Sequence, residues 1–286
     1  MKIIFVLMLI TGACFALDPD AGHLSQRTCD PAEPETDDWI IDITSINDVS
    51  MAWANCLRGC DFFEGELFVT DFIQDSIYAV NPNTGAKTFG MPCPPQIPQV
   101  FGICCYSIPA ESFIYINDWD SDTEIYRYST VSGWSYAFDN PSPEPRGIDF
   151  DPSLNIWEID AYSHILYVFD IGGTVSDSWT LSELPSSNAC GCSVFPFGSD
   201  LGIIIGGYEY SDFYFYSFDG STLEYLGAAP VPQSAVASYG ISWSDLTQSF
   251  YWIYLDGSYI FRLCEFTVEF EVTLDQSTWG AIKTEF

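Results

Sequence analysis

The chain has 286 residues, of which 48% are hydrophobic, and it carries 8 basic and 40 acidic residues, giving a net charge of −32 at pH 7. A surface with this excess of acids repels phosphate backbones and anionic membranes, which excludes nucleic acid as a partner. Length and apolar content favour one large β domain. The acids either keep the protein soluble, as in salt-adapted proteins, or favour divalent cations and basic partners.

The N-terminus has the features of a secretory signal. Lys2 precedes the apolar run 3–10, and small residues follow as far as Ala16, so we expect a signal peptide over residues 1–16 with cleavage after Ala16. Lipid attachment at Cys14 is the alternative. The run is too short to cross a bilayer, and no other segment is apolar for long enough. The sequence therefore predicts a secreted or periplasmic protein without a transmembrane segment.

Residues 17–38 are rich in proline and acids and poor in apolar residues, which predicts an exposed, weakly ordered arm. Residues 39–43 then have the pattern of an isolated strand. Similar apolar residues return near the C-terminus, at 278–283.

A unit of four short segments, clearest at residues 146–181, is repeated along the chain. The first segment is found as Arg146-Gly147-Ile148, Phe101-Gly102-Ile103 and Tyr239-Gly240-Ile241, and more loosely as Cys190-Gly191-Cys192 and Val49-Ser50-Met51. The second is found at 66–71, 112–118, 155–160, 201–206 and 250–254, and the third at 76–81, 124–128, 164–170, 213–218 and 259–263. All are rich in β-branched and aromatic residues and are separated by turn formers, which predicts antiparallel meanders.

Proline supports this division of the chain. It clusters just before the first segment of successive units, at Pro92, Pro94, Pro95 and Pro98, at Pro141, Pro143 and Pro145, at Pro185, and at Pro230 and Pro232. Since proline cannot donate to a strand ladder, it is expected where the chain leaves one sheet for the next.

Repeated four-stranded units at a spacing of roughly 45 residues predict an all-β fold, a β-propeller over residues 39–286. We expect five blades, or six if the terminal segments 39–43 and 278–283 form a further one. In either case these two segments are expected to close the ring.

The units resemble the blades of NHL-repeat, gluconolactonase-like and Tyr-Trp-Thr-Asp propellers. An example is Tyr251-Trp252-Ile253-Tyr254 with Asp256-Gly257 following, although the Thr and Asp of the last signature are absent. The resemblance covers nearly the whole mature chain and implies the propeller fold. The gluconolactonase-like group further implies a central cation held by carboxylate and amide groups, for which Asp149, Glu158 and Asn117 are candidates.

One loop has the composition of a calcium site, because acids at alternate positions can direct several oxygens at one hard cation. The candidate ligands are Asp118, Asp120, Asp122 and Glu124. Asp71, Asp160 and Asp256 stand near the same hairpin of other units. The alternative role of the first ligand is therefore to stabilise its own turn.

Four aromatic residues fall in the hairpins between second and third segments and are expected to share one rim of the ring, where they suit contacts with a sugar or peptide. They are Trp119, Tyr162, Tyr208 and Tyr210. A solvated rim without function is the alternative. Other aromatics should pack between blades, namely Phe150, Trp157, Phe169, Trp243 and Phe261.

Ten cysteines, one of them in the predicted signal, leave nine in the mature chain. In an exported protein these are expected to form disulfides, and the odd number leaves at least one thiol unpaired within the chain. The disulfide candidates are Cys56, Cys60, Cys104, Cys105, Cys190 and Cys192. Cys264, in an apolar strand, is the candidate for a free buried thiol.

Histidine is nearly absent, with only His23 and His164, so a Ser-His-Asp triad or a histidine-rich zinc site has too few residues. The sequence therefore favours a secreted, non-catalytic binding propeller with an acidic rim, whose ligand is an extracellular protein or a carbohydrate. A metal-dependent hydrolase or lyase of the gluconolactonase-like kind and a structural surface protein are the alternatives.

Overall fold

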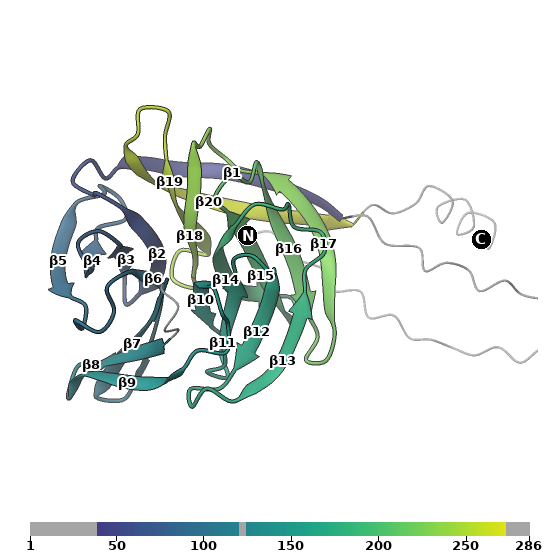
Figure 1. The fold of residues 1–286 in the computed structure, drawn as a ribbon. Coiled ribbons are helices and arrows are strands. Elements are labelled where there is room, and N and C mark those ends of the chain that lie inside the picture. Colours follow the sequence, from purple (N-terminus) through teal and green to yellow (C-terminus); the bar gives the residue numbers. More distant parts are fainter. Residues whose placement is uncertain (1–38, 120–123, 273–286) are drawn as a thin grey trace, which may run out of the picture. The chain divides into compact units, whose positions relative to one another are not determined.

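The computed structural model describes residues 39–119 and 124–272 of the chain. The chain divides at Thr36, and the described residues belong to the second unit, Asp37–Phe286. Their strands form five four-stranded antiparallel sheets, the blades of a five-bladed β-propeller (Figure 1). The predicted signal and arm, residues 1–38, lie outside the described part.

Four blades are meanders of consecutive strands. Blade 1 contains β2 (Leu57–Phe63), β3 (Glu66–Asp71), β4 (Ser76–Val80) and β5 (Lys87–Pro92). Blade 2 contains β6 (Val100–Ile108), β7 (Glu111–Asp118), β8 (Glu124–Ser129) and β9 (Gly133–Asp139). Blade 3 contains β10 (Pro145–Phe150), β11 (Ile156–Asp160), β12 (Ile165–Phe169) and β13 (Val175–Thr180), and blade 4 contains β14 (Ala189–Phe197), β15 (Asp200–Gly207), β16 (Asp212–Phe218) and β17 (Leu223–Pro230).

Blade 5 closes the ring with strands from both ends of the described chain. It contains β18 (Ala237–Ser244), β19 (Ser249–Leu255) and β20 (Phe261–Val272), and its outermost strand is β1 (Trp39–Ser50). Figure 1 shows β1, in purple, beside β20, in yellow, and the two pair antiparallel from Trp39 opposite Val272 to Ser50 opposite Arg262. Arg262 also binds Asp48 of β1, with Nη2 and Oδ2 3.0 Å apart. Closure by residues 39–43 is confirmed, and residues 278–283 lie outside the described part.

The predicted second and third segments coincide with the second and third strands of all five blades. The first segment of blade 1 was assigned wrongly. Val49 and Ser50 end β1, the outermost strand of blade 5, and Met51 follows it, whereas the innermost strand of blade 1 is β2 with Arg58-Gly59-Cys60. Blade 1 has Cys60 after the glycine, whereas three of the other first segments have isoleucine at this position, and this difference hid the repeat.

The hydrophobic core is divided into five clusters, one at each contact between neighbouring blades. Trp157, Phe169 and Phe261 are buried in them, as predicted, and Phe150 and Trp243 pack at their edges. Trp157 stacks on Trp179 with ring centroids 5.8 Å apart. Because each blade is too thin to exclude water alone, burial against two neighbours supplies most of its stability.

Candidate functional site

The innermost strands of the five blades meet around the propeller axis at a ring of glycines. These are Gly59, Gly102, Gly147, Gly191 and Gly240. A Cβ atom on Gly102 would lie 2.2 Å from the backbone oxygen of Arg146 in the next blade, and the other four would meet a neighbouring backbone within 2.6 Å. The gap between these strands has no room for a water molecule. The ring therefore separates two mouths, the lower one where the innermost strands end and the upper one where they begin.

Polar side chains two residues after these glycines tie neighbouring blades together at the lower mouth. Asp61 Oδ2 accepts from the backbone N–H of Cys105 at 2.6 Å, and Asp149 Oδ2 accepts from that of Val194 at 2.8 Å. The Ser193 hydroxyl likewise accepts from the backbone N–H of Trp243, and the Ser242 hydroxyl accepts from that of Phe62, in each case from the next blade. Cys104, at this position in blade 2, is the exception, because the Phe150 N–H opposite it donates to Asp149 Oδ1.

A cavity of about 480 Å³ opens at the lower mouth, and Asp61 and Asp149 contribute to its lining. Its other acids are Asp151, Asp200 and Asp245, and its aromatic residues are Phe62, Phe63, Tyr106, Phe150, Phe195 and Trp243. None of the described residues that line it is basic. Asp151 accepts from Asn155 and Trp157 and holds the hairpin of blade 3, so its role is structural.

The environment of the two inner aspartates disfavours their charged forms. Burial raises the pKa of Asp61 to about 6 against the hydrogen bonds from Ser242 and Cys105, which lower it. Burial, followed by the charge of Asp61, raises the pKa of Asp149 well above its usual range. Two carboxylates that repel each other without a basic neighbour are stabilised either by a proton or by a cation.

At the upper mouth, two arginines stand in the position before the axial glycine. The Arg146 guanidinium is buried, with its carbon 3.6 Å from the centroid of the Trp119 ring. The Arg58 guanidinium carbon lies 4.3 Å from the Tyr239 ring centroid and 5.3 Å from that of Phe72. Both guanidinium groups are stabilised by cation–π contacts with these rings.

A buried polar network lies beside Arg146. Glu158 Oε2 accepts from Asn117 Nδ2 and Asn140 Nδ2, each at 2.8 Å, and Asn117 Oδ1 accepts from the backbone N–H of Gly102 at 2.6 Å. Glu158 Oε1 has no hydrogen-bond partner among the described residues. Burial raises the pKa of Glu158 to about 8. Asn117 and Glu158 thus meet here, whereas Asp149 lies at the lower mouth, so the three candidate cation ligands do not form one site.

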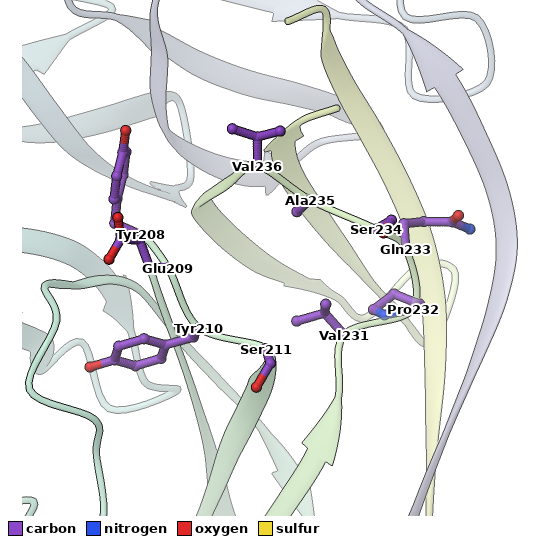
Figure 2. A pocket seen from close by; sticks show the side chains of 10 residues that line it. All are labelled: Tyr208, Glu209, Tyr210, Ser211, Val231, Pro232, Gln233, Ser234, Ala235 and Val236. Atoms are coloured by element: carbon purple, nitrogen blue, oxygen red, sulfur yellow. The ribbon is translucent and has the colours of Figure 1, made fainter. Parts of the chain in front are cut away.

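A second cavity, of about 520 Å³, lies on the upper side between two segments of blades 4 and 5 (Figure 2). Tyr208 and Tyr210, two of the four predicted rim aromatics, line it. Tyr208 is 40% exposed, whereas Tyr210 is buried and donates its hydroxyl to the Ser187 carbonyl at 3.1 Å.

The other two rim aromatics lie apart from this cavity. Tyr162 is 57% exposed and lines neither of the two cavities. Trp119 packs beneath the Arg146 guanidinium and against Phe72 and Phe101. A binding role for these four residues stays a prediction.

The predicted calcium loop is only partly described, because Asp120 and Asp122 lie outside the described residues. Asp118 is buried, and Glu124 accepts a hydrogen bond from the Tyr126 hydroxyl at 2.8 Å. In the described part, no three His, Cys, Asp or Glu side chains group as metal ligands. The aspartates at equivalent hairpins do stabilise turns: Asp71 accepts from the N–H groups of residues 73 and 74, and Asp160 from those of 162 and 163.

The eight described cysteines are free thiols, so the six disulfide candidates are not paired with one another. Cys104 and Cys105 point to opposite sides of β6, the first toward blade 3 and the second toward blade 1. Cys192 is buried between blades 3 and 4, and Cys60 between blades 5 and 1. Secretion predicts disulfides in general, but here the thiols fill separate parts of the core. Cys264 is a buried free thiol, as predicted.

Of the two lower-mouth aspartates, Asp149 was a candidate cation ligand in the sequence, whereas Asp61 was missed although a signal was present. Blades 1 and 3 share the pattern Arg-Gly-x-Asp-Phe, at residues 58–62 and 146–150. Wrong assignment of the first strand of blade 1 concealed it.

No family model matches the sequence, and no curated protein matches it. The fold resembles that of several solved enzymes. Glutaminyl cyclase of Myxococcus xanthus aligns at a TM-score of 0.57 and 14% identity, over 81% of this chain and 97% of that one. The PQQ-bound aldose sugar dehydrogenase of Streptomyces coelicolor aligns at a TM-score of 0.54 and 12% identity, over 80% of this chain and 99% of that one. A luciferin-regenerating enzyme aligns at a TM-score of 0.51 and 10% identity, over 75% of this chain and 92% of that one.

These likenesses define the chain as a β-propeller. At such identities they show the fold alone, because propellers carry many unrelated functions. The described residues include no helix long and apolar enough to cross a membrane.

Proposed function

We propose that this propeller is an extracellular, non-catalytic binding protein whose lower-mouth cavity takes an organic cation, an ammonium group on an aliphatic or aromatic body. The observation that carries the proposal is the placement of Asp61 and Asp149 in a cavity whose described lining has no basic residue.

Charge supports a cationic ligand. Hydrogen bonds from neighbouring blades hold Asp61 and Asp149 in place, so the two carboxyls cannot turn away from each other, and without a cation their repulsion favours a protonated carboxyl. An ammonium group placed between them would take over the role of that proton and stabilise the carboxylates. In a partly desolvated site this attraction is much stronger than at an open surface.

The aromatic walls support an apolar body on that cation. Tyr106, Phe150 and Trp243 are partly exposed in the cavity. Trp243 is fixed by a hydrogen bond from its indole nitrogen to Asp245 Oδ1 at 2.8 Å. Aromatic faces attract cations and cover apolar groups, and a volume of this size suits a small organic ligand.

The alternatives receive less support. The metal-dependent hydrolase needs Asp149 near Asn117 and Glu158, and these residues lie apart. A purely structural protein has no need of two cavities. The enzymes with similar folds leave catalysis open, since fold does not determine activity.

Isothermal titration calorimetry with phenethylammonium tests the proposal, with the neutral 2-phenylethanol as the matched ligand. The wild type should bind the ammonium and not the alcohol, and Asp149→Asn should weaken binding about tenfold or more. Asp177→Asn changes the net charge equally at an exposed position of β13 and should leave binding unchanged. Equal binding of the alcohol, or equal affinity of the two variants, would overturn the proposal.

We also propose calcium binding by the loop that contains Asp118, Asp120, Asp122 and Glu124. The support is the alternation of acids in the sequence. Thermal unfolding with calcium and with a chelator tests it, because a ligand of the folded state raises the melting temperature. A melting temperature indifferent to both would refute it.

A further inference from the structure

The upper cavity in Figure 2 is a site distinct from the lower mouth. It lies between the hairpin turn 208–211 of blade 4 and the segment 231–236, which connects blades 4 and 5. It shares no lining residue with the lower cavity.

Hydrogen bonds hold the two walls of this cavity in place. The N–H of Val231 donates to the Ser211 carbonyl, and that of Ser238 donates to the Tyr208 carbonyl, each at 3.0 Å. The buried Tyr210 anchors the turn from below through its hydroxyl. The cavity is therefore formed before a ligand arrives, which lowers the entropic cost of binding.

Its chemistry differs from that of the lower mouth. The exposed ring of Tyr208 is steadied by an edge contact with Tyr239, at 5.8 Å between centroids. Among the described residues of the lining, Glu209 is the only charged one, and Ser211, Gln233 and Ser234 are neutral hydrogen-bonding groups. The Gln233 side chain donates to Ser45 of β1 and points away from Tyr208 and Glu209 (Figure 2).

An aromatic face beside neutral polar groups and a single carboxylate matches a ligand with C–H faces and many hydroxyls. We infer that this cavity binds a carbohydrate, with a sugar ring against Tyr208 and its hydroxyls hydrogen-bonded to Glu209. The volume of about 520 Å³ is sufficient for one or two sugar units.

Saturation-transfer NMR with glucose, galactose, mannose and N-acetylglucosamine at millimolar concentration tests this inference, followed by titration of the sugar that gives the strongest signal. Tyr208→Ala should weaken binding about tenfold, and Glu209→Gln, at an exposed position that does not endanger folding, should weaken it several-fold. Tyr259→Ala is the matched control, because it removes an exposed tyrosine from the equivalent turn of blade 5 that lines neither cavity.

Binding of none of the four sugars would overturn the inference, as would equal losses in Tyr208→Ala and Tyr259→Ala. Asp149→Asn separates the two sites. If that variant also abolishes sugar binding, the sugar occupies the lower mouth and the inference fails, whereas unchanged binding supports it.

Discussion

The buried carboxyl of Glu158 should make the stability of the propeller fall as the pH rises, and Glu158→Gln should remove this dependence. Burial raises the folded-state pKa from 4.5 to about 8. The folded state therefore keeps a proton that the unfolded state releases above pH 4.5. The contribution of Glu158 to the free energy of unfolding is most favourable below pH 4.5 and is lost progressively up to about pH 8. Above pH 8 it no longer changes with pH.

The magnitude follows from the pKa difference. Each unit of pKa corresponds to about 1.4 kcal/mol, so the full loss between pH 4.5 and pH 8 is about 5 kcal/mol. Glutamine can still accept from Asn117 and Asn140 at the position of Oε2. Its amide N–H groups would stand at Oε1, which has no hydrogen-bond partner in the described part of the chain, and this adds a pH-independent cost of about 1–3 kcal/mol.

Urea unfolding at pH 5, 6, 7 and 8 measures the effect. With rising pH, the free energy of unfolding of the wild type should fall relative to that of Glu158→Gln by about 1.4 kcal/mol per pH unit. Glu224→Gln, at an exposed position of β17, is the control and should show a constant difference. If Glu158→Gln also differs from the wild type by the same amount at every pH, the reasoning about the buried carboxyl is refuted.

Three further substitutions test the fold, each by chemical unfolding. Gly102→Ala should lower the free energy of unfolding by about 3 kcal/mol, because its Cβ would lie 2.2 Å from the facing backbone oxygen. Gly257→Ala is the control and should lower it by less than about 0.5 kcal/mol, because no described atom lies near its Cβ. Equal losses would argue against close contact at the axis. Arg262→Ala should cost about 1 kcal/mol by removing the partly buried pair with Asp48, and no loss would mean that this pair does not help to close the ring. Trp157→Ala should cost about 3–5 kcal/mol, since its side chain is fully buried between blades, and a loss below about 1 kcal/mol would contradict that packing.

The fold was predictable because its signals are local and repeated. Second and third strands are rich in β-branched and aromatic residues with turn formers between them, and prolines mark the exits from four blades. The first strand of blade 1 was not found, because residues 49–51 resemble the first segment of a unit although Val49 and Ser50 pair with β20. A pattern of this kind does not say which sheet a strand joins.

The sites were less predictable, because they depend on which side a residue faces and on partners distant in the chain. Tyr208 and Tyr210 were predicted at the rim, but the opposite wall, residues 231–236, could not be assigned to them from sequence. Asp149 was a candidate cation ligand from the sequence, but its pairing with Asp61 became recognisable only once both were placed two residues after an axial glycine. The disulfide prediction followed from compartment alone and ignored the directions of the side chains, which set Cys104 and Cys105 on opposite faces.

A crystal structure of the protein soaked with phenethylammonium is the most direct test of the central claim, that the lower-mouth cavity recognises an organic cation. The account predicts the ammonium nitrogen within hydrogen-bond distance of the Asp61 or Asp149 carboxylate, with the ring against the aromatic wall. An empty lower mouth at saturating ligand, or a ligand bound only elsewhere, would contradict it.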